Sequence, residues 1–180
     1  MKSVEKTIEK YGIIQKGDKI GVACSGGKDS MTLLHYLNSI SKEKGFEVIA
    51  ITVDHGIRET SDNDAEFVVN YCNTMGIKVI KQKVNALKVS QDKNVTIETA
   101  ARECRFKVFK ALLNKGIVNK IALGHHLQDQ AETILLNIFR GTGITGASGM
   151  DVIRDGVYIR PLLYTTRAEI MAYVNTNEIP

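Results

Sequence analysis

The chain alternates between short apolar runs and longer stretches in which apolar residues recur every three or four positions. The short runs predict buried strands at residues 20–24, 48–53, 78–84 and 120–123. The periodic stretches predict helices at residues 3–11, 31–37, 62–75 and 96–115, with another after residue 126. Strand and helix thus alternate repeatedly, which is typical of an α/β fold with an open, doubly wound, mostly parallel sheet and helices on both faces.

The remaining stretches predict less regular structure. Residues 85–95 are polar and predict a loop, and the glycines within residues 141–149 predict a glycine-rich loop. Residues 152–159 predict a small hairpin around an Asp-Gly turn, and residues 167–174 begin a last helix. Periodicity also predicts buried faces: Ala101, Cys104, Val108 and Leu112 in the 96–115 helix, and an apolar stripe of Ile134, Leu135, Ile138 and Phe139 in the helix after residue 126.

Polar and titratable residues follow three of the predicted strands. They are residues 25–30 after the first strand, residues 54–55 after the second, and residues 124–126 after the fourth. In a doubly wound sheet, ligands bind beyond the carboxyl ends of the strands. We therefore expect these three motifs to meet in one crevice.

The loop Ser25–Ser30 reads Ser-Gly-Gly-Lys-Asp-Ser, between a strand and a helix. Backbone N–H groups and the dipole at a helix N-terminus favour phosphate there, and the two glycines let its oxygens approach closely. The spacing is not that of a Walker sequence. Asp29 predicts Mg²⁺, because a carboxylate beside phosphates is repelled unless a cation lies between them. The alternative is a glycine-rich turn in which Asp29 and Ser30 only cap the helix.

The stretch His125–Thr133 is the second candidate site. On a helix, His125, Asp129 and Glu132 lie at i, i+4 and i+7 and share a face. Three interpretations stay open: a capping histidine with solvated acids, a site for Zn, Mn or Fe, or acids that hold an amine substrate and take its proton. The phosphate loop favours the third, because an activated oxygen must be displaced, and an amine of pKa near ~10.4 needs a base or a desolvated pocket.

Arg102 and Arg105, about one helix turn apart, are candidates for neutralising phosphate or an RNA backbone. The alternative for Arg102 is an ion pair with Glu98, four residues earlier. Such pairs are common on exposed helices.

Composition narrows the class of protein. A chain of 180 residues with 43% hydrophobic and 24% charged residues predicts one soluble globular domain and excludes a disordered protein. The net charge of +4 permits a polyanionic partner without requiring one. Scattered cysteines (Cys24, Cys72, Cys104), no signal-peptide pattern and no apolar run of membrane-spanning length predict a cytoplasmic protein with no membrane partner.

Motifs spread along the chain resemble the tRNA(Ile)-lysidine synthetase family. Ser25–Ser30 resembles the pyrophosphate loop of the N-type ATP pyrophosphatases, the PP-loop superfamily. The other motifs are Val53-Asp54-His55-Gly56-Ile57-Arg58, Ile97–Phe106, His125–Thr133 running into Arg140–Gly143, and Ile159–Leu163 followed by Arg167–Ile170. The resemblance covers nearly the whole chain. It implies an adenine nucleotide alpha hydrolase-like fold, with residues 1–180 as a single ATP-binding catalytic domain.

The resemblance implies a carbon–nitrogen ligase that modifies the wobble cytidine of an isoleucine tRNA. ATP, with Mg²⁺, adenylates the C2 carbonyl oxygen and releases pyrophosphate; the ε-amine of free L-lysine then displaces AMP to give lysidine. The implied partners are the anticodon loop of this tRNA and lysine. The resemblance implies catalytic roles for Asp29, Arg102, Asp129 and Glu132, nucleotide binding by Ser25, Gly26, Gly27, Lys28, Asp29, Ser30, Val53, Gly124 and His125, and magnesium binding by Asp29.

The chain departs from the family pattern in several respects. Gln128 stands where the family usually has the first of two acids, which puts in question any role that needs both. Lys28 fills a variable loop position and is frequent in the related tRNA thiolation enzymes. The family normally continues into C-terminal tRNA-binding domains that are absent here, so we expect a piece of a longer protein. The oligomeric state is left open, with a homodimer as one option.

Two other functions remain as alternatives. A tRNA thiolation enzyme of the same superfamily could use Cys24 as a sulfur carrier, although the C-x-x-C pairs typical of such enzymes are missing. A nucleotide-binding sensor without chemistry would keep the loop but would not need Asp129 or Glu132. Pyrophosphate release that depends on both tRNA and lysine separates the ligase from the sensor.

Overall fold

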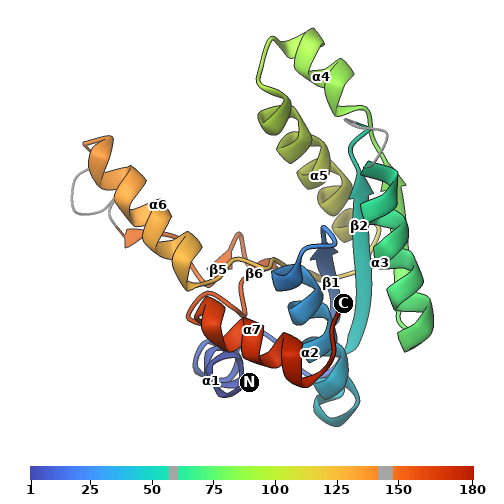
Figure 1. Ribbon diagram of the computed structural model, residues 1–180, viewed down its shortest axis with the longest axis vertical. Helices are drawn as coiled ribbons and strands as arrows, with labels where there is room; N and C mark the ends of the chain where they lie inside the picture. The colour runs from blue at the N-terminus through green and yellow to red at the C-terminus, as the bar shows by residue number, and fades with distance from the viewer. Residues whose placement is uncertain (57–60, 142–147) are drawn as a thin grey trace.

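The computed structural model describes residues 1–56, 61–141 and 148–180. Its centre is a six-stranded sheet in the order β3-β2-β1-β4-β6-β5 (Figure 1). The strands are β1 (Lys19–Cys24), β2 (Glu47–Asp54), β3 (Lys78–Lys83), β4 (Lys120–Ala122), β5 (Ile153–Arg154) and β6 (Tyr158–Ile159). Neighbouring strands are parallel except β5 and β6, so the predicted mostly parallel sheet is confirmed.

The part of the chain that the structure describes contains seven helices. They are α1 (Lys2–Tyr11), α2 (Lys28–Lys44), α3 (Ser61–Met75), α4 (Ala86–Lys93), α5 (Ile97–Asn114), α6 (Leu127–Phe139) and α7 (Arg167–Thr176). Among the described residues, no helix is both long and apolar enough to cross a membrane.

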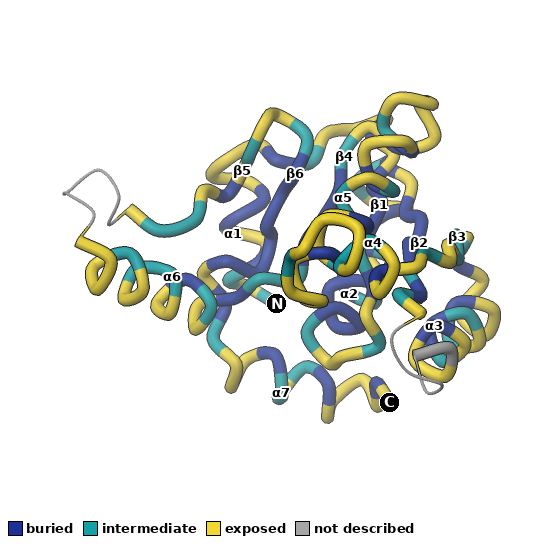
Figure 2. The backbone as a smooth tube through the Cα atoms, turned by 90° about the horizontal axis from the view of Figure 1, so that it is seen from above, coloured by how far each residue is buried: buried dark blue, intermediate teal, exposed yellow. Residues whose placement is uncertain are grey.

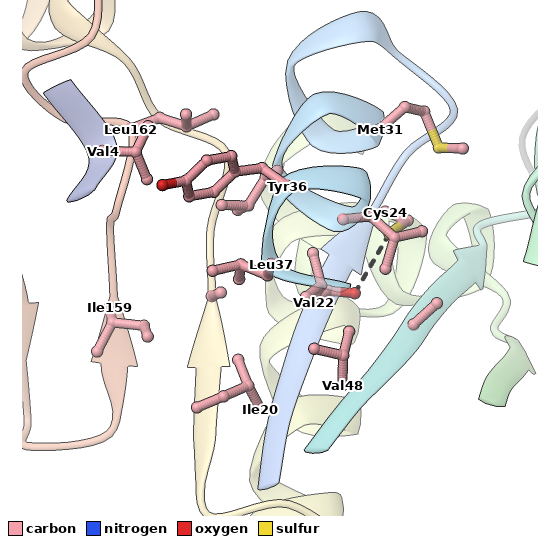
Figure 3. Close-up of a cluster of buried hydrophobic side chains, with 14 of the residues drawn as sticks. Val4, Ile20, Val22, Cys24, Met31, Tyr36, Leu37, Val48, Ile159 and Leu162 are labelled. Carbon is pink, nitrogen blue, oxygen red and sulfur yellow. Dashed lines mark hydrogen bonds between the residues drawn. The ribbon is translucent and has the colours of Figure 1, made fainter. Parts of the chain in front are cut away.

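Two buried clusters cover the two faces of the sheet, as a doubly wound fold requires. The larger joins β1 to α1, α2, α3 and α7, and Figure 3 shows part of it, where Val22 of β1 faces Leu37 of α2. The second joins β2 and β4 to α5 through Ile51, Ile121 and Phe109. Figure 2 shows that β1, β2, β4 and β6 are mostly buried, whereas the edge strands β3 and β5 are not. The core thus fixes α2 and α5 on opposite faces.

Gly21 explains how closely the middle of the sheet packs. It lies on β1 beside Ile49 of β2 and Ile121 of β4. A Cβ atom at this position would lie 2.5 Å from Cδ1 of Ile51 and 3.0 Å from Cδ1 of Ile121. Any side chain here would displace the isoleucines that pack against α5.

The loop predicted for residues 85–95 is wrong, because helix α4 occupies residues 86–93. The Asn85 side chain accepts a hydrogen bond from Lys88 N at 2.9 Å, and Asn94 ends the helix in the left-handed conformation with φ 52°. Both ends therefore carry good capping residues. The buried Ala86 lies against the rest of the fold, and this tertiary packing outweighs the polar local sequence.

The buried face of α5 differs from the prediction, and the apolar stripe predicted for α6 is not buried. In α5 the buried residues are Ala100, Cys104, Phe109 and Leu112, so the predicted Ala101 and Val108 are only partly buried. In α6 the apolar stripe faces solvent: Leu135 is 52%, Ile138 53% and Phe139 84% exposed. Figure 1 shows why, since α6 points away from the sheet and none of the other described helices covers it.

The predicted hairpin is confirmed, and it extends the sheet. β5 and β6 pair antiparallel around Asp155 and Gly156, both at positive φ, and β6 also pairs in parallel with β4. Ile57 and Arg58 of the second motif, and residues 142–147 of the predicted glycine-rich loop, lie outside the described residues.

Candidate active site

A pocket of about 360 Å³ lies beyond the carboxyl ends of β1, β2 and β4. Its lining brings together the three motifs that follow these strands, together with α5 and the start of α6. The residues that carry polar side chains into it are Ser25, Asp29, Ser30, Thr52, His55, Asp64, Arg102, Arg105, His125 and Asp129. The predicted crevice is therefore present, at the switch point where β2 and β4 leave β1 on opposite sides.

The phosphate loop leads directly into α2. The N-cap is Gly27, which has no side chain to bond the first backbone N–H groups of the helix. Those groups remain available to an anion at the positive end of the helix dipole. Ser30 Oγ donates to Gly27 O at 2.9 Å and accepts from Ser25 N at 3.2 Å, so it closes the loop from inside.

The backbone conformation at position 26 requires glycine. The φ of Gly26 is +81°, and a Cβ atom would lie 3.5 Å from the Asp64 backbone oxygen at the start of α3. A non-glycine residue rarely adopts this φ. The loop therefore keeps its shape by backbone geometry and by the hydroxyl of Ser30.

His126 lies between the carboxylates of the two motifs. It is the N-cap of α6, and its backbone N–H donates to Asp129 Oδ2 at 2.8 Å. Its Nδ1 accepts from Gln128 N at 3.2 Å, which leaves Nε2 to carry the ring proton. Nε2 lies 3.7 Å from Asp29 Oδ2. The imidazole is 6% exposed, so it holds the start of α6 beside the start of α2.

His125 precedes the helix, so the predicted shared face of His125, Asp129 and Glu132 is wrong in geometry. The helix begins at Leu127, after residue 126 as predicted, so His125 lies before its N-cap and outside the helical spacing. His125 Nδ1 accepts from Arg160 Nε at 3.1 Å. Burial, followed by the charge of Arg160, lowers the pKa of His125 to about 4, and the imidazole is neutral at pH 7.

Two arginines of α5 form the wall of the pocket that faces α2. Arg102 lies over the Phe106 ring at 5.3 Å from its centroid, and among the described residues it makes no ion pair with Glu98. Burial, then the charge of Arg102, lowers the pKa of Arg105. Guanidinium groups remain charged in proteins, so this wall presents two positive charges.

Most of the residues predicted from the sequence lie around this pocket. The lining contains Ser25, Gly27, Asp29, Ser30, Val53, Arg102, Gly124, His125 and Asp129, whereas Gly26, Lys28 and Glu132 are outside it. Lys28 is exposed on the first turn of α2, and Glu132 is exposed one turn along α6. Gln128 is also outside, and its Oε1 accepts from Arg167 N at 3.2 Å at the start of α7.

Sequence reasoning assigned no role to several residues that shape the pocket. His55 Nδ1 is buried without a hydrogen-bond partner among the described residues, so it can bond a ligand. Arg160, 4% exposed, positions His125 and donates to Asp151 O at 2.6 Å. The end of a strand already placed His55 in the predicted crevice, and the same signal, the end of β6, could have identified Arg160. Asp64, at the start of α3, has no such signal.

The residues at the phosphate loop fit a magnesium ion better than a metal held by protein alone. Among the described residues there is no group of three His, Cys, Asp or Glu side chains placed to hold a metal. Mg²⁺ is usually bound by one or two carboxylates together with substrate phosphates and water. Asp29, on the first turn of α2 and with its side chain 39% exposed, can provide that carboxylate.

The cysteines are buried thiols. Burial, then the proximity of Cys72, raises the pKa of Cys24, and burial raises the pKa of Cys72 to about 11. Both thiols are protonated at pH 7 and are therefore weak nucleophiles. Cys24 lines the pocket but donates to Val22 O at 3.4 Å.

Comparison with known proteins places this site in a family. The model of the PP-loop domain matches residues 1–180. The tRNA(Ile)-lysidine synthase of Clostridium tetani is 43% identical over 177 residues, 98% of this chain and 38% of the relative. That of Clostridioides difficile is 43% identical over 171 residues, 94% of this chain and 37% of the relative. The chain thus spans less than two-fifths of these relatives.

The fold agrees with this sequence similarity. The U34-tRNA thiolase NcsA from Methanococcus maripaludis superposes with a TM-score of 0.80 over 99% of this chain and 64% of the thiolase, at 20% identity. At 20% identity, this similarity shows a shared fold and nothing further. The family resemblance in the motifs is confirmed by the relatives' sequences, and the chain belongs to the PP-loop domain family.

Proposed function

We propose that the chain is the catalytic part of a tRNA(Ile)-lysidine synthase. One observation carries the proposal: an open phosphate loop, an arginine wall and the Asp129 carboxylate meet in a single pocket. The relatives that bear this name support it with 43% identity over nearly the whole chain. In this proposal residues 1–180 form one ATP-binding domain, which acts on tRNA in the cytoplasm.

The first step is adenylation of the wobble cytidine. The C2 carbonyl oxygen attacks the α-phosphorus of ATP, and the bond to the β-phosphate oxygen breaks to release pyrophosphate. The N–H groups at the start of α2, with Ser25 and Ser30, would hold the β- and γ-phosphates. Arg102 and Arg105 would neutralise charge on the α-phosphate as it becomes five-coordinate.

The second step transfers lysine. The ε-amine attacks C2, the C2–O bond breaks, and AMP leaves with the oxygen that the cytidine contributed. The amine must lose protons, because its solution pKa is near ~10.4. Asp129 would receive one: Oδ2 is engaged by His126 N, and Oδ1 has no partner among the described residues. Glu132, exposed outside the pocket, would bind lysine at the entrance.

Asp29 would hold Mg²⁺ together with phosphate oxygens of ATP. When bound, the ion would neutralise the charge that builds on the pyrophosphate leaving group. The contribution of the chain is to fix Asp29, whose backbone belongs to the first turn of α2 and whose Oδ2 lies near His126 Nε2. Gly26, Lys28, Val53, Gly124 and His125 complete the proposed nucleotide site.

Incubation of the chain with ATP, labelled L-lysine and an isoleucine tRNA tests the proposal. We expect mass spectrometry of the tRNA to find the wobble cytidine heavier by one lysine minus water, with AMP and pyrophosphate released in equal amounts. Thiolated cytidine or uridine would instead identify a thiolation enzyme, which the buried, protonated Cys24 does not favour. Pyrophosphate release without tRNA and lysine would also contradict the proposal.

A further inference from the structure

The positive charge of the chain is concentrated in one segment. Residues 83–115 contain eight Lys and Arg and three Asp and Glu, a net charge of +5. Of the 24 Lys and Arg and 20 Asp and Glu in the chain, 16 and 17 remain elsewhere, so the rest carries −1. This segment comprises α4 and α5, which rise beyond the arrowheads of β1 and β2 in Figure 1.

The lysines of α4 and α5 form an open surface rather than an ion-pair network. We call Lys88, Lys107, Lys110 and Lys115 the lysine surface, and all four are exposed. None of them has an ion-pair partner among the described residues; the nearby Lys93 bonds Glu103. Unpaired lysines on one side of a helix pair create a local positive potential that favours a polyanion.

A groove next to this surface adds apolar area. It has a volume of about 750 Å³ and lies between α4 and α5. Val84, Val89 and Leu112 contribute apolar lining, while Lys88, Lys107 and Lys115 line it with cationic groups. Asp92 and Glu103 also line the groove, so the lysines, with Lys93, outnumber the acids. Such a groove can take a sugar or base edge while the lysines contact phosphates.

The lysine surface and the active-site pocket share α5. Arg102 and Arg105 line the pocket, and Lys107 and Lys110 follow within two turns of the same helix. Another helix at the pocket, α6, carries Asp129 and Glu132 and no Lys or Arg. An RNA entering the pocket therefore meets an acidic side on α6 and a cationic side on α5.

We propose that the α4–α5 lysine surface binds the backbone of the RNA whose nucleotide enters the pocket. The RNA strand crosses the outer side of α5, its phosphates contact Lys107 and Lys110, and the adjacent groove receives part of the flanking stem. The partner chemistry rests on the proposed function, whereas the place of binding rests on the charge distribution alone. Phosphate contacts of this kind supply affinity and register without base specificity.

A binding titration without ATP or lysine tests the surface separately from the ligase reaction. The probe is a labelled RNA hairpin with the anticodon loop of an isoleucine tRNA, followed by fluorescence anisotropy. Lys107→Glu/Lys110→Glu is compared with Lys2→Glu/Lys6→Glu on α1, which makes the same charge change at exposed positions of another helix. Circular dichroism and urea unfolding of both variants establish that they fold.

We expect the Lys107→Glu/Lys110→Glu variant to bind the hairpin at least ~10-fold more weakly at about 50 mM salt. Its slope of log affinity against log salt should fall by about 0.7–0.9 for each lost phosphate contact, and the slope of the α1 variant should stay unchanged. Equal losses of affinity in both variants would show that net charge alone explains the effect and would overturn the proposal. Displacement of the hairpin by poly-glutamate of equal charge, at equal concentration, would assign the surface to acidic proteins instead.

The outcome does not depend on the proposed reaction. If lysine transfer fails but the slopes differ as expected, the surface stands and the chemistry is wrong. If lysine transfer succeeds at saturating RNA and the two variants bind alike, the reaction stands and the surface is wrong.

Discussion

At the scale of single residues, the three candidate carboxylates differ in the contacts that hold them. Asp29 is fixed by the first turn of α2, whereas Asp129 uses one oxygen to cap α6 through His126. Glu132 is exposed and outside the pocket. The sequence identified all three acids and a helix after residue 126, but it could not reveal that the His126 ring caps this helix and leaves His125 outside it. The start of a helix depends on local hydrogen bonds that several neighbouring residues could make.

Replacement of Asp29 by asparagine removes the charge and keeps the shape. We expect Asp29→Asn to lower the rate of tRNA-dependent pyrophosphate release by about 10²-fold or more, because a preorganised charge at the leaving group is lost. The control is Glu43→Gln near the other end of α2, an exposed residue outside the pocket, where the rate should stay within ~3-fold. A normal rate in Asp29→Asn would remove this carboxylate from the mechanism.

The lowered pKa of His125 predicts that the free energy of unfolding depends on pH. This pKa falls from the ordinary value to about 4 in the folded chain, so between these values the unfolded chain binds more protons. The stabilisation is therefore present above the unfolded pKa and is lost as pH falls toward 4. Urea unfolding should show that the wild-type chain loses more stability between pH 7 and 4.5 than His125→Asn, by on the order of 2 kcal/mol.

Asparagine can still accept from Arg160, so the comparison isolates the imidazole proton. His55 and His35 also have lowered pKa values because of burial, and they titrate in both proteins. Parallel curves of stability against pH for the two proteins would show that His125 is not held neutral.

At the scale of elements, hydrophobic periodicity located the strands and most helices but failed where tertiary packing decides. Helix α4 is polar and has good local caps, and it packs against α5 rather than against the sheet. The stripe on α6 has helical period, yet its side chains face solvent. Periodicity identifies a helix face that could be buried, whereas the neighbours that would bury it are distant in sequence.

Phe109 and Phe139 give a matched test of this difference. Phe109 of α5 is 1% exposed and Phe139 of α6 is 84% exposed. Phe109→Ala should lower the free energy of unfolding by about 3–5 kcal/mol, because it removes buried area and leaves a cavity. Phe139→Ala should change it by no more than ~0.5 kcal/mol. Urea denaturation measures both, and a large loss in Phe139→Ala would mean that α6 is covered in solution.

At the scale of the whole molecule, the pocket joins elements from both faces of the sheet. α2 packs on one face and α5 on the other, and the end of β4 lies close to α2, since a Cβ at Gly124 would lie 3.4 Å from Ser30 N. The alternation of strands and helices predicted this convergence, because topology alone decides which ends meet. The contact of Arg160 with His125 depends instead on the β5–β6 hairpin, because β6 pairs with β4.

Because the pocket connects both faces, ligand binding there should stabilise the entire chain. ATP with Mg²⁺ at ~100 times its Kd should raise the free energy of unfolding by about 2.7 kcal/mol. For a chain of this size that corresponds to an increase in Tm of about 5–10 °C, measurable by calorimetry. Pyrophosphate with Mg²⁺ should give part of the shift through the phosphate loop, and Asp29→Asn should lose the part that needs Mg²⁺. An equal Tm shift in Asp29→Asn would locate the magnesium ion away from α2.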